Sequence, residues 1–345
     1  MKAVLFRSQD RFSAFLSKLK EYEIECTILD FEGHEWIGFD YNTIDFLIYY
    51  PSFEYSSNHP LALQKVYDNL LFIHSEHPHL VMFPDPNGIK YYNDKYKQYL
   101  FLSQHSYPTP ETIPLLSENS LDLAEKKLGY PMVIKNRYGA GGNSVFKVHN
   151  KKELRRYYNL STLNLFNIDS AKYFAKMFSK RIFYYHLIRE KRANYPFLSP
   201  PLLAQKFITI DRDLKTVVGD GQVVEAHWRY QADPSMWKMN IDGGGTGVWG
   251  YIPDEALELS VRLAKDLKVR WLNLDLMMSD GKFLISEFSP VWHHYKYKEK
   301  LSFVYRDDYN IDVPLKISLD FERIIIESLI KAARERVRGE RSKER

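Results

Sequence analysis

The chain has 345 residues, 45% of them hydrophobic and 27% charged, so it is long enough for two or three folded domains and is not disordered overall. The single cysteine, Cys26, excludes an intramolecular disulfide, and no apolar run approaches the roughly 20 residues of a membrane helix, so we expect a cytoplasmic protein without a membrane segment. The net charge of +4 comes from residues 331–345, with seven basic and three acidic side chains, and the balanced remainder argues against a broad surface for nucleic acid. We expect these last residues to be a solvated helix end rather than a binding arm.

Residues 1–88 alternate short apolar runs with helical patterns. The apolar runs lie at 2–6, 26–29, 45–50 and 80–83, and the helical patterns at 12–19 and 61–72. This alternation is typical of βαβ units and predicts a small, mostly parallel α/β domain. Turn-forming residues at 84–88 then mark its boundary. We expect residues 89–130 to connect it to the rest, with a helix that begins at Asn93 or Asp94.

Residues 131–204 are predicted to form a second unit, whose first strand ends at Lys135. A Gly-rich run follows, then a strand at 145–148 and a helix at 152–158. The aromatic-rich stretch 160–201 has two interpretations. It is either an additional helical layer or dimer surface, which would make the protein a homo-oligomer, or a lid that contacts substrate.

Residues 205–330 are predicted to form the C-terminal unit, followed by a charged tail at 331–345. The unit contains strands at 203–208, 214–218 and 223–229, a helix with Leu259, Leu263 and Leu267 at i, i+4 spacing, a hairpin at 271–289 and a last helix at 321–329. The helix spacing predicts one apolar face that packs on a sheet.

The hairpin at 271–289 carries two acidic residues whose relative orientation depends on its turn. A two-residue turn at 280–281 would pair Asp275 with Ser286 and put Glu287 on the opposite face of the sheet. The two carboxylates could not then share a metal ion.

A three-residue loop at 279–281 is the turn that we favour. It pairs Asp275 with Ile285 and places Glu287 and Ser289 on the same face as Asp275. Diagonal neighbours of this kind lie about 7 to 8 Å apart, within reach of one or two shared Mg²⁺ ions. Acidic residues on a solvent-facing strand are the plain alternative.

A lysine and a glycine-rich run have the chemistry of a phosphate site. Lys135 ends an apolar strand, and Gly141 and Gly142 in the run after it lack the side chains that would keep backbone N–H groups from phosphate oxygens. A plain hairpin turn would have the same glycines, and Lys95 at a helix start is typical of a solvated lysine.

Residues 205–213, which follow the second unit, have the chemistry of a nucleoside site. Gln205-Lys206-Phe207-Ile208 alternates polar and apolar residues, as a strand with one face on an adenine pocket does, and Asp213 beyond it can accept from ribose hydroxyls. Arg229, Lys238 and Asn240 could place two cations and an amide near a transferring phosphoryl group. Each residue alone is also typical of an ordinary turn or surface.

The order of these motifs resembles the ATP-grasp superfamily over residues 90–330, most closely its RimK-like and glutathione-synthetase-like ligases. The matching stretches are Asn93-Asp94-Lys95, 108–110, 130–135, 139–145, 205–213, Arg229 with Asn240, and Asp275 with Glu287. The resemblance implies a two-subdomain ATP-grasp fold, in which a lid and an α+β subdomain clamp ATP, with a smaller α/β domain in front.

The resemblance also implies a role for each matching residue. Lys95 and Lys135 would bind phosphate and Gly141 and Gly142 form the tip of the phosphate loop, while Gln205, Lys206, Phe207 and Ile208 would meet adenine and Asp213 the ribose. Arg229 would steady an acyl phosphate, with Asn240 as a nearby contact, and Lys215 stands where relatives often have arginine. Asp275, Glu287 and Ser289 would hold the metal.

Three features depart from the family pattern. Gln205 stands where glutamate is usual, but its amide oxygen also accepts from the adenine amino group. Ser289 stands where asparagine usually binds the second metal, and a hydroxyl is a shorter and poorer ligand. The aromatic insertion at 160–201 matches no family role.

We therefore expect an ATP-dependent carboxylate–amine or carboxylate–thiol ligase that works through an acyl phosphate and releases ADP and phosphate. ATP and Mg²⁺ are the expected cofactors, with Mn²⁺ as an alternative metal, and the substrates would be small-molecule or peptide carboxylates and amines. A small-molecule kinase on the same scaffold and an ATP-binding regulatory module without turnover are the alternative functions.

Overall fold

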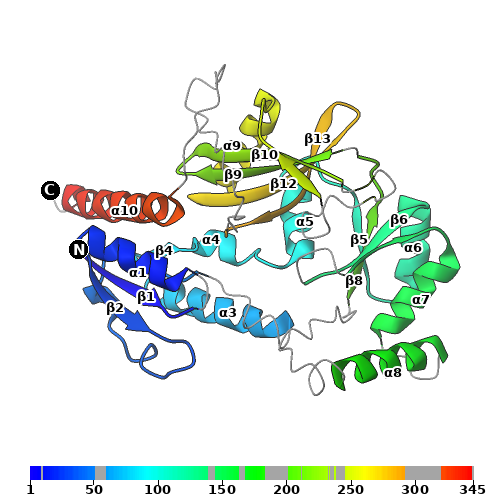
Figure 1. Ribbon diagram of the computed structural model, residues 1–345, viewed down its shortest axis with the longest axis horizontal. Coiled ribbons are helices and arrows are strands. Elements are labelled where there is room, and N and C mark those ends of the chain that lie inside the picture. The colour runs from blue at the N-terminus through cyan, green and yellow to red at the C-terminus, as the bar shows by residue number, and fades with distance from the viewer. Residues whose placement is uncertain are drawn as a thin grey trace.

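The computed structural model describes residues 1–8, 11–50, 60–138, 144–162, 168–182, 201–210, 212–231, 233, 237, 245–291 and 320–343. Within these residues the chain forms three β-sheets with helices packed on them (Figure 1). We name them sheet A (β1–β4), sheet B (β5–β8) and sheet C (β9–β13). A parallel N-terminal sheet followed by two antiparallel sheets confirms the predicted fold class.

Sheet A has four parallel strands in the order β2-β1-β3-β4, and its central strands β1 and β3 are buried on both faces, while the edge strand β2 is largely exposed. Its strands are β1 (Lys2–Phe6), β2 (Glu25–Leu29), β3 (Phe46–Ile48) and β4 (Val81–Phe83). Ala3 and Leu5 pack toward α1 (Phe12–Glu21), while Val4 and Phe6 pack toward α3 (Pro60–Glu76). A parallel sheet needs cover on both faces, which explains its near-continuous apolar runs.

The last helix, α10 (Phe321–Lys343), returns to sheet A, where it contacts α1, β3 and β4 (Figure 1). Its apolar face joins the core on the α1 side of sheet A through Phe321, Ile325 and Leu329. Arg11 pairs with Glu322 at 2.6 Å at the start of this helix. The C-terminal segment therefore completes the N-terminal core.

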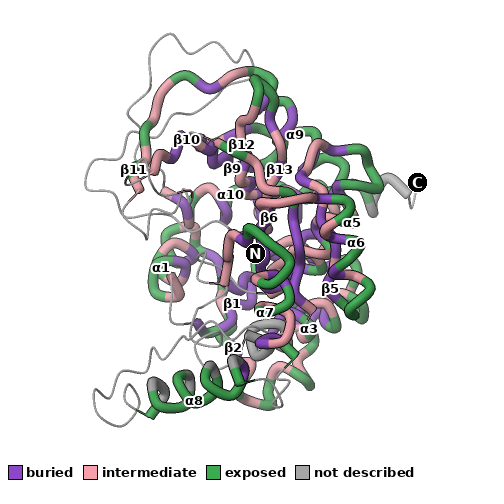
Figure 2. The backbone as a smooth tube through the Cα atoms, turned by 90° about the vertical axis from the view of Figure 1, so that its right-hand side faces the viewer, coloured by how far each residue is buried: buried purple, intermediate pink, exposed green. Residues whose placement is uncertain are grey.

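Sheet B is antiparallel, in the order β5-β8-β6-β7. Its strands are β5 (Thr112–Leu115), β6 (Met132–Asn136), β7 (Val145–Val148) and β8 (Leu202–Lys206), and its helices α6 (Glu118–Leu128) and α7 (Lys151–Ser161). Leu121 and Leu154 from the helices share a core with Ile134 and Ala204 from the sheet. The helix α8 (Ile168–Ile182), from the aromatic-rich stretch, contacts α7 and is largely exposed (Figure 2).

Sheet C is antiparallel, in the order β11-β10-β9-β12-β13. Its strands are β9 (Arg212–Gly219), β10 (Gln222–Tyr230), β11 (Thr246–Val248), β12 (Trp271–Ser279) and β13 (Lys282–Ser289). The helix α9 (Asp254–Leu267) covers one face, where Leu214 and Leu274 pack against Leu263. Because side chains alternate along a strand, polar residues gather on the other face, which we call the polar face.

Two short helices lead from sheet A to the other sheets. After α4 (Pro86–Ile89), α5 (Lys95–Gln104) contacts both β5 and β13. Gln98 fixes α5 to sheet C, because its Oε1 accepts from Phe288 N at 3.2 Å while its Nε2 donates to the Tyr91 carbonyl at 3.0 Å. The N-terminus of α5 is thereby held close to the edge of sheet C.

The turn of the β12–β13 hairpin is shorter than we predicted. Ser279 pairs with Lys282, so the turn has two residues, Asp280 and Gly281, both at positive φ (51° and 73°). The predicted three-residue loop is wrong, because this residue pair suits the tight turn that matches strand twist.

A β-bulge further along the hairpin restores the shared face. The register shifts between Asp275 and Leu276, which leaves Ser286 as an additional residue in β13. Asp275 therefore lies directly opposite Glu287, rather than opposite Ser286 or Ile285. The two carboxylates share a face as predicted, for a reason that the sequence did not indicate.

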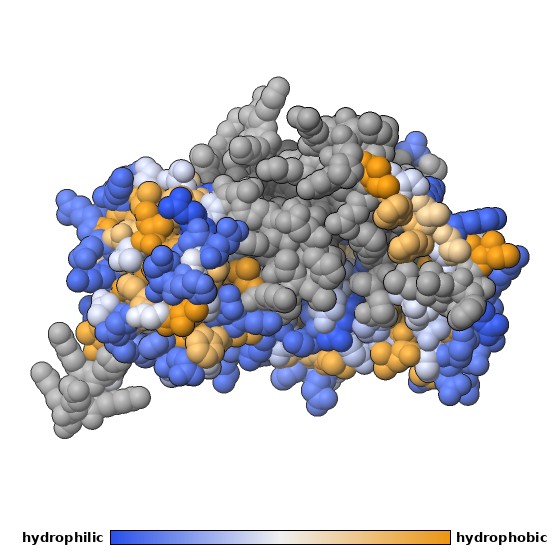
Figure 3. All heavy atoms as spheres, turned by 90° about the horizontal axis from the view of Figure 1, so that it is seen from below, coloured by the Kyte–Doolittle hydropathy of each residue, from blue (hydrophilic) through white to orange (hydrophobic). Residues whose placement is uncertain are grey.

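The described surface is mixed in character. On the face in Figure 3, apolar atoms form small groups between hydrophilic ones. Of the helices that the structure describes, none is long and apolar enough to cross a membrane.

Gly219 at the end of β9 is expected to tolerate no side chain. A Cβ at this position would lie 2.8 and 2.9 Å from two ring atoms of Trp271 and 3.1 Å from Val224. Gly219→Ala should therefore lower the free energy of unfolding by about 1 to 3 kcal/mol, measured by chemical denaturation. Gly250→Ala, where a Cβ meets nothing within 4 Å, is the control and should leave it unchanged. Equal stabilities of the two variants would contradict the packing described here.

Candidate nucleotide-binding and catalytic site

Titratable side chains form one transverse row on the polar face of sheet C. His227 on β10 lies opposite Lys215 on β9, Lys215 opposite Asp275 on β12, and Asp275 opposite Glu287 on β13. We call these four residues the central row. Direct neighbours in such a row have Cβ atoms about 4.5 to 5.5 Å apart, so their side chains can act on one ligand.

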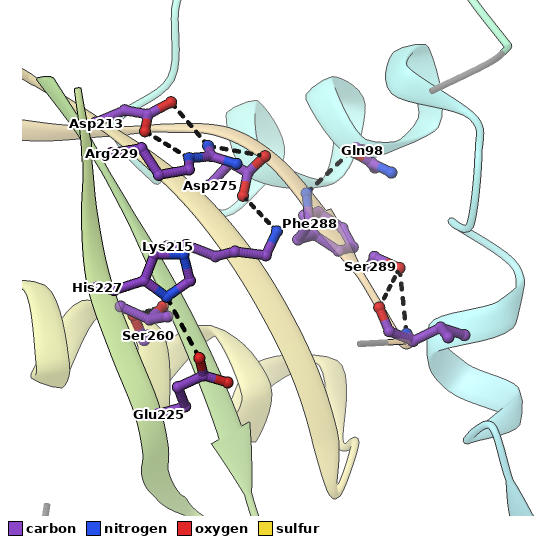
Figure 4. Close-up of polar contacts among 12 residues, drawn as sticks. Gln98, Asp213, Lys215, Glu225, His227, Arg229, Ser260, Asp275, Phe288 and Ser289 are labelled. Atoms are coloured by element: carbon purple, nitrogen blue, oxygen red, sulfur yellow. Dashed lines mark hydrogen bonds and ion pairs between the residues drawn. The ribbon is translucent and has the colours of Figure 1, made fainter. Parts of the chain in front are cut away.

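Arg229 connects the central row to Asp213 (Figure 4). Its guanidinium donates from Nε and a terminal nitrogen to the two carboxylate oxygens of Asp213, at 2.6 and 2.7 Å. The same terminal nitrogen lies 3.2 Å from Asp275 Oδ2, and Lys215 Nζ donates to Asp275 Oδ1 at 3.0 Å. Two carboxylates and two cations are thus joined in a single network.

The two aspartates of this network have opposite pKa shifts. Burial raises the pKa of Asp213 to about 6, although Arg229 opposes the shift. Burial also acts to raise the pKa of Asp275, but Arg229 and Lys215 outweigh it and hold this pKa below its usual range. Asp275 therefore stays ionised at neutral pH, as a metal ligand must.

Three predicted nucleotide contacts come together opposite the edge of sheet C. Lys135 Nζ donates to Gln205 Oε1 at 2.9 Å, across the β6–β8 pair, and Gln205 Nε2 donates to Thr112 Oγ1 at 2.8 Å. Lys95 Nζ lies 3.8 Å from Glu287 Oε2. Burial and the nearby Lys95 lower the pKa of Lys135 to about 8, although Glu287 acts in the opposite direction.

Sequence reasoning missed an ion pair that connects these lysines. Asp94 caps α5 as predicted, accepting from Lys97 N at 3.1 Å. It also accepts from two guanidinium nitrogens of Arg137 at 2.7 and 2.6 Å, and Lys95 N donates to the Arg137 carbonyl at 3.1 Å. This contact brings the end of β6 to the start of α5. The only signal for it in the sequence was that Asp94 and Arg137 lie close in the chain to Lys95 and Lys135, the predicted phosphate ligands.

The predicted adenine contacts lie at and beyond the end of β8. Lys206 is exposed, while Phe207 and Ile208 are half-buried. The Phe207 ring has Lys147 Nζ 3.8 Å from its centroid and the Trp237 ring 6.0 Å away.

Ser289 lies on the same face as Glu287 and directly opposite Asn273. Its hydroxyl is engaged locally, donating to the Val291 carbonyl at 3.0 Å and accepting from Val291 N at 3.2 Å. Asn273 Oδ1 is buried and has no hydrogen-bond partner among the residues that the structure describes. Asn273 was not among the predicted ligands.

Four predicted site residues, Gly141, Gly142, Lys238 and Asn240, lie outside the described residues. The described ranges contain no group of three or more His, Cys, Asp or Glu side chains that could hold a metal ion.

Sequence comparison places part of this chain in a known family. The family model described as the ATP-grasp domain matches residues 92–173. N-acetylaspartylglutamate synthase A of Homo sapiens is 26% identical over 209 residues, which cover 59% of this chain and 44% of that protein. Alpha-aminoadipate–LysW ligase LysX of Saccharolobus solfataricus is 26% identical over 265 residues, which cover 74% and 84%. The chain thus spans less than half the length of the human relative.

Solved structures with the same fold match nearly the whole chain. D-alanine–D-alanine ligase from Bacillus anthracis aligns with a TM-score of 0.57 and 13% identity, over 98% of this chain and 99% of that one. The ATP-grasp ligase PsnB, complexed with its minimal precursor, aligns with a TM-score of 0.58 and 14% identity, over 96% and 98%. Residues 92–173 therefore match the ATP-grasp domain, and nearly the whole chain has the fold of solved ATP-grasp ligases, in agreement with the resemblance found in the sequence.

Proposed function

We propose that the protein is an ATP-dependent ligase that joins a carboxylate to an amine and releases ADP and phosphate. The observation that carries this proposal is the central row, in which two opposed carboxylates adjoin Lys215 and Arg229, with Lys95 3.8 Å from Glu287. Such a cluster has the charges needed to hold a phosphoryl donor and to stabilise its transfer.

In this proposal ATP lies between sheets B and C. Lys95 and Lys135 bind its phosphates, Gly141 and Gly142 close the phosphate loop, and Gln205, Lys206, Phe207 and Ile208 surround adenine. Asp213 is proposed to bind the ribose, as the family resemblance implies. The Asp94–Arg137 ion pair holds the segments that carry Lys95 and Lys135 together.

The residues present fit a Mg²⁺ ion, a hard cation that takes oxygen ligands. Asp275 and Glu287 supply two opposed carboxylates. Since Ser289 Oγ is engaged with Val291, we propose that the buried Oδ1 of Asn273, directly opposite, supplies the amide oxygen that the family usually has at position 289. When bound, the metal would neutralise phosphate oxygens and polarise the phosphoryl group.

The chemistry has two steps on the polar face. The substrate carboxylate attacks the γ-phosphorus, ADP leaves, and Lys135 offsets the charge that develops. The amine then attacks the carbonyl carbon of the acyl phosphate, where Arg229, Lys215 and Asn240 are proposed to stabilise the oxyanion before phosphate leaves.

The substrates are proposed as small molecules or peptides. The names of the relatives contain glutamate, aminoadipate and alanine, which supports an amino acid as one partner. Pure protein incubated with Mg-ATP and pools of carboxylates and amines should release ADP and phosphate, and mass spectrometry should find a product lighter by one water than its two substrates. A stable phosphorylated product without any amine would select a kinase instead.

Replacing Glu287 by Gln should abolish Mg²⁺-dependent ADP formation and leave the fold intact. The amide keeps the shape of the side chain but removes one of the two opposed charges, so we expect a loss of at least about 100-fold in kcat. The control is Asp280→Asn, on the turn of the same hairpin, where asparagine suits the positive φ of 51° and activity should be unchanged. Wild-type turnover in Glu287→Gln would remove Glu287 from the metal site.

ATP affinity should fall as the pH rises through about 8. Lys135 has its pKa lowered to about 8 in the free protein, and bound phosphate would raise it, so binding takes up a proton above that pH. The dissociation constant of ATP, measured by calorimetry between pH 7.5 and 9.5 without metal, should rise by up to about tenfold per pH unit. Gln205→Glu would place a carboxylate beside Lys135 and flatten this dependence. A pH-independent constant in the wild type would exclude Lys135 as the titrating phosphate ligand.

A further inference from the structure

Most charges on the polar face of sheet C have an opposite charge beside them. Asp213 pairs with Arg229, Asp275 with Lys215 and Arg229, and Glu287 with Lys95. Among the described residues of this face, Glu225 on β10 is the carboxylate that no cation contacts.

Glu225 is 5% exposed, and its two oxygens differ in their surroundings. Oε1 lies 3.4 Å from Nδ1 of His227, which is 1% exposed (Figure 4). Oε2 is buried and has no hydrogen-bond partner within the described part of the chain. Burial lowers the pKa of His227, although Glu225 opposes this, so the imidazole is neutral and does not balance the carboxylate.

A buried carboxylate without a cation is costly, typically by several kcal/mol, and natural proteins retain such groups where a ligand supplies the missing charge. The oxygen of Glu225 that lacks a partner therefore indicates a position for a cationic group. The neutral His227 beside it is held by the Trp249 ring, whose centroid lies 4.9 Å away.

The position lies next to the centre where an acyl phosphate would form. Glu225 is opposite Val217, and Lys215 is two residues before Val217 on the same strand, which makes Glu225 and Lys215 diagonal neighbours. Diagonal neighbours are about 7 to 8 Å apart, a span that one small substrate bridges. His227 lies between them in the central row, directly opposite Lys215.

We propose that Glu225 binds the ammonium group of the amine substrate and that His227 accepts the first proton which that nitrogen loses. This assignment rests on the ligase function proposed above. An ammonium group has three donors and one positive charge, which match one carboxylate and one neutral imidazole. Enclosure away from bulk water strengthens the attraction between the two charges.

The step balances in atoms and charge. The substrate nitrogen forms a bond to the carbonyl carbon of the acyl phosphate, and the bond from that carbon to the phosphate oxygen breaks with its electron pair. The ammonium loses two protons on the way to the amide. The first moves to His227 and frees the nitrogen lone pair for attack, while Glu225 stabilises the imidazolium that results. The second leaves the tetrahedral intermediate on the departing phosphate. The products are the amide and inorganic phosphate.

The test separates the two half-reactions with hydroxylamine, a small uncharged nucleophile that traps acyl phosphates as hydroxamates. Wild-type protein receives Mg-ATP, the carboxylate pool and either hydroxylamine or a mixture of the twenty L-amino acids. Glu225→Gln should form hydroxamate at the wild-type rate, while its KM for the amino acid rises roughly 10- to 100-fold, the factor for losing a hydrogen bond to a charged group. His227→Gln should instead lower kcat for the amino acid.

Two controls keep the test independent of folding and of the proposed function. Glu258→Gln, on the exposed side of α9, should match wild type in every rate. The thermal midpoint of Glu225→Gln should equal or exceed that of wild type, because the substitution removes a buried charge. An unchanged amine KM, or a loss of hydroxamate together with a lower midpoint, would overturn the assignment of Glu225. No hydroxamate from wild type with any carboxylate would instead overturn the ligase function itself.

Discussion

The guanidinium of Arg229 contacts both Asp213 and Asp275, and the chemistry of the polar face depends on this bridge. A carboxylate taken out of water takes up a proton unless a nearby cation favours its charge. Burial raises the pKa of Asp213 to about 6, whereas Asp275 stays charged because Arg229 and Lys215 together outweigh its burial. Removal of this bridge would raise the pKa of Asp275, the proposed metal ligand.

The site is assembled from parts that are far apart in the chain. Lys95 begins α5, Lys135 and Gln205 lie on neighbouring strands of sheet B, and the central row belongs to sheet C. The Asp94–Arg137 pair connects sheet B to α5, and Gln98 connects α5 to β13. Two short polar links therefore set the distance between the proposed phosphate and metal groups.

In the β12–β13 hairpin the predicted turn length is wrong, but the two carboxylates still share a face as predicted. The sequence Asp280-Gly281 suits a two-residue turn, which by itself would have put Asp275 and Glu287 on opposite faces. The bulge at Ser286 restores the shared face beside two hydrogen bonds to a distant segment. Ile285 N donates to the Pro108 carbonyl at 2.7 Å, and the Thr109 hydroxyl donates to the Ile285 carbonyl at 2.9 Å. These partners are about 176 residues away in the chain, so no local pattern could have indicated the bulge.

The sequence by itself determined which elements form and which residue types could hold a nucleotide. Alternation of apolar residues, a capped helix start at Asp94 and the order of lysines, glycines and carboxylates are local properties that act on each segment before it packs. Only the tertiary structure decided which charges meet. It paired Arg229 with two aspartates, joined Arg137 to Asp94, and left Glu225 buried beside a neutral histidine, because each outcome depends on strand register and on contacts between distant segments.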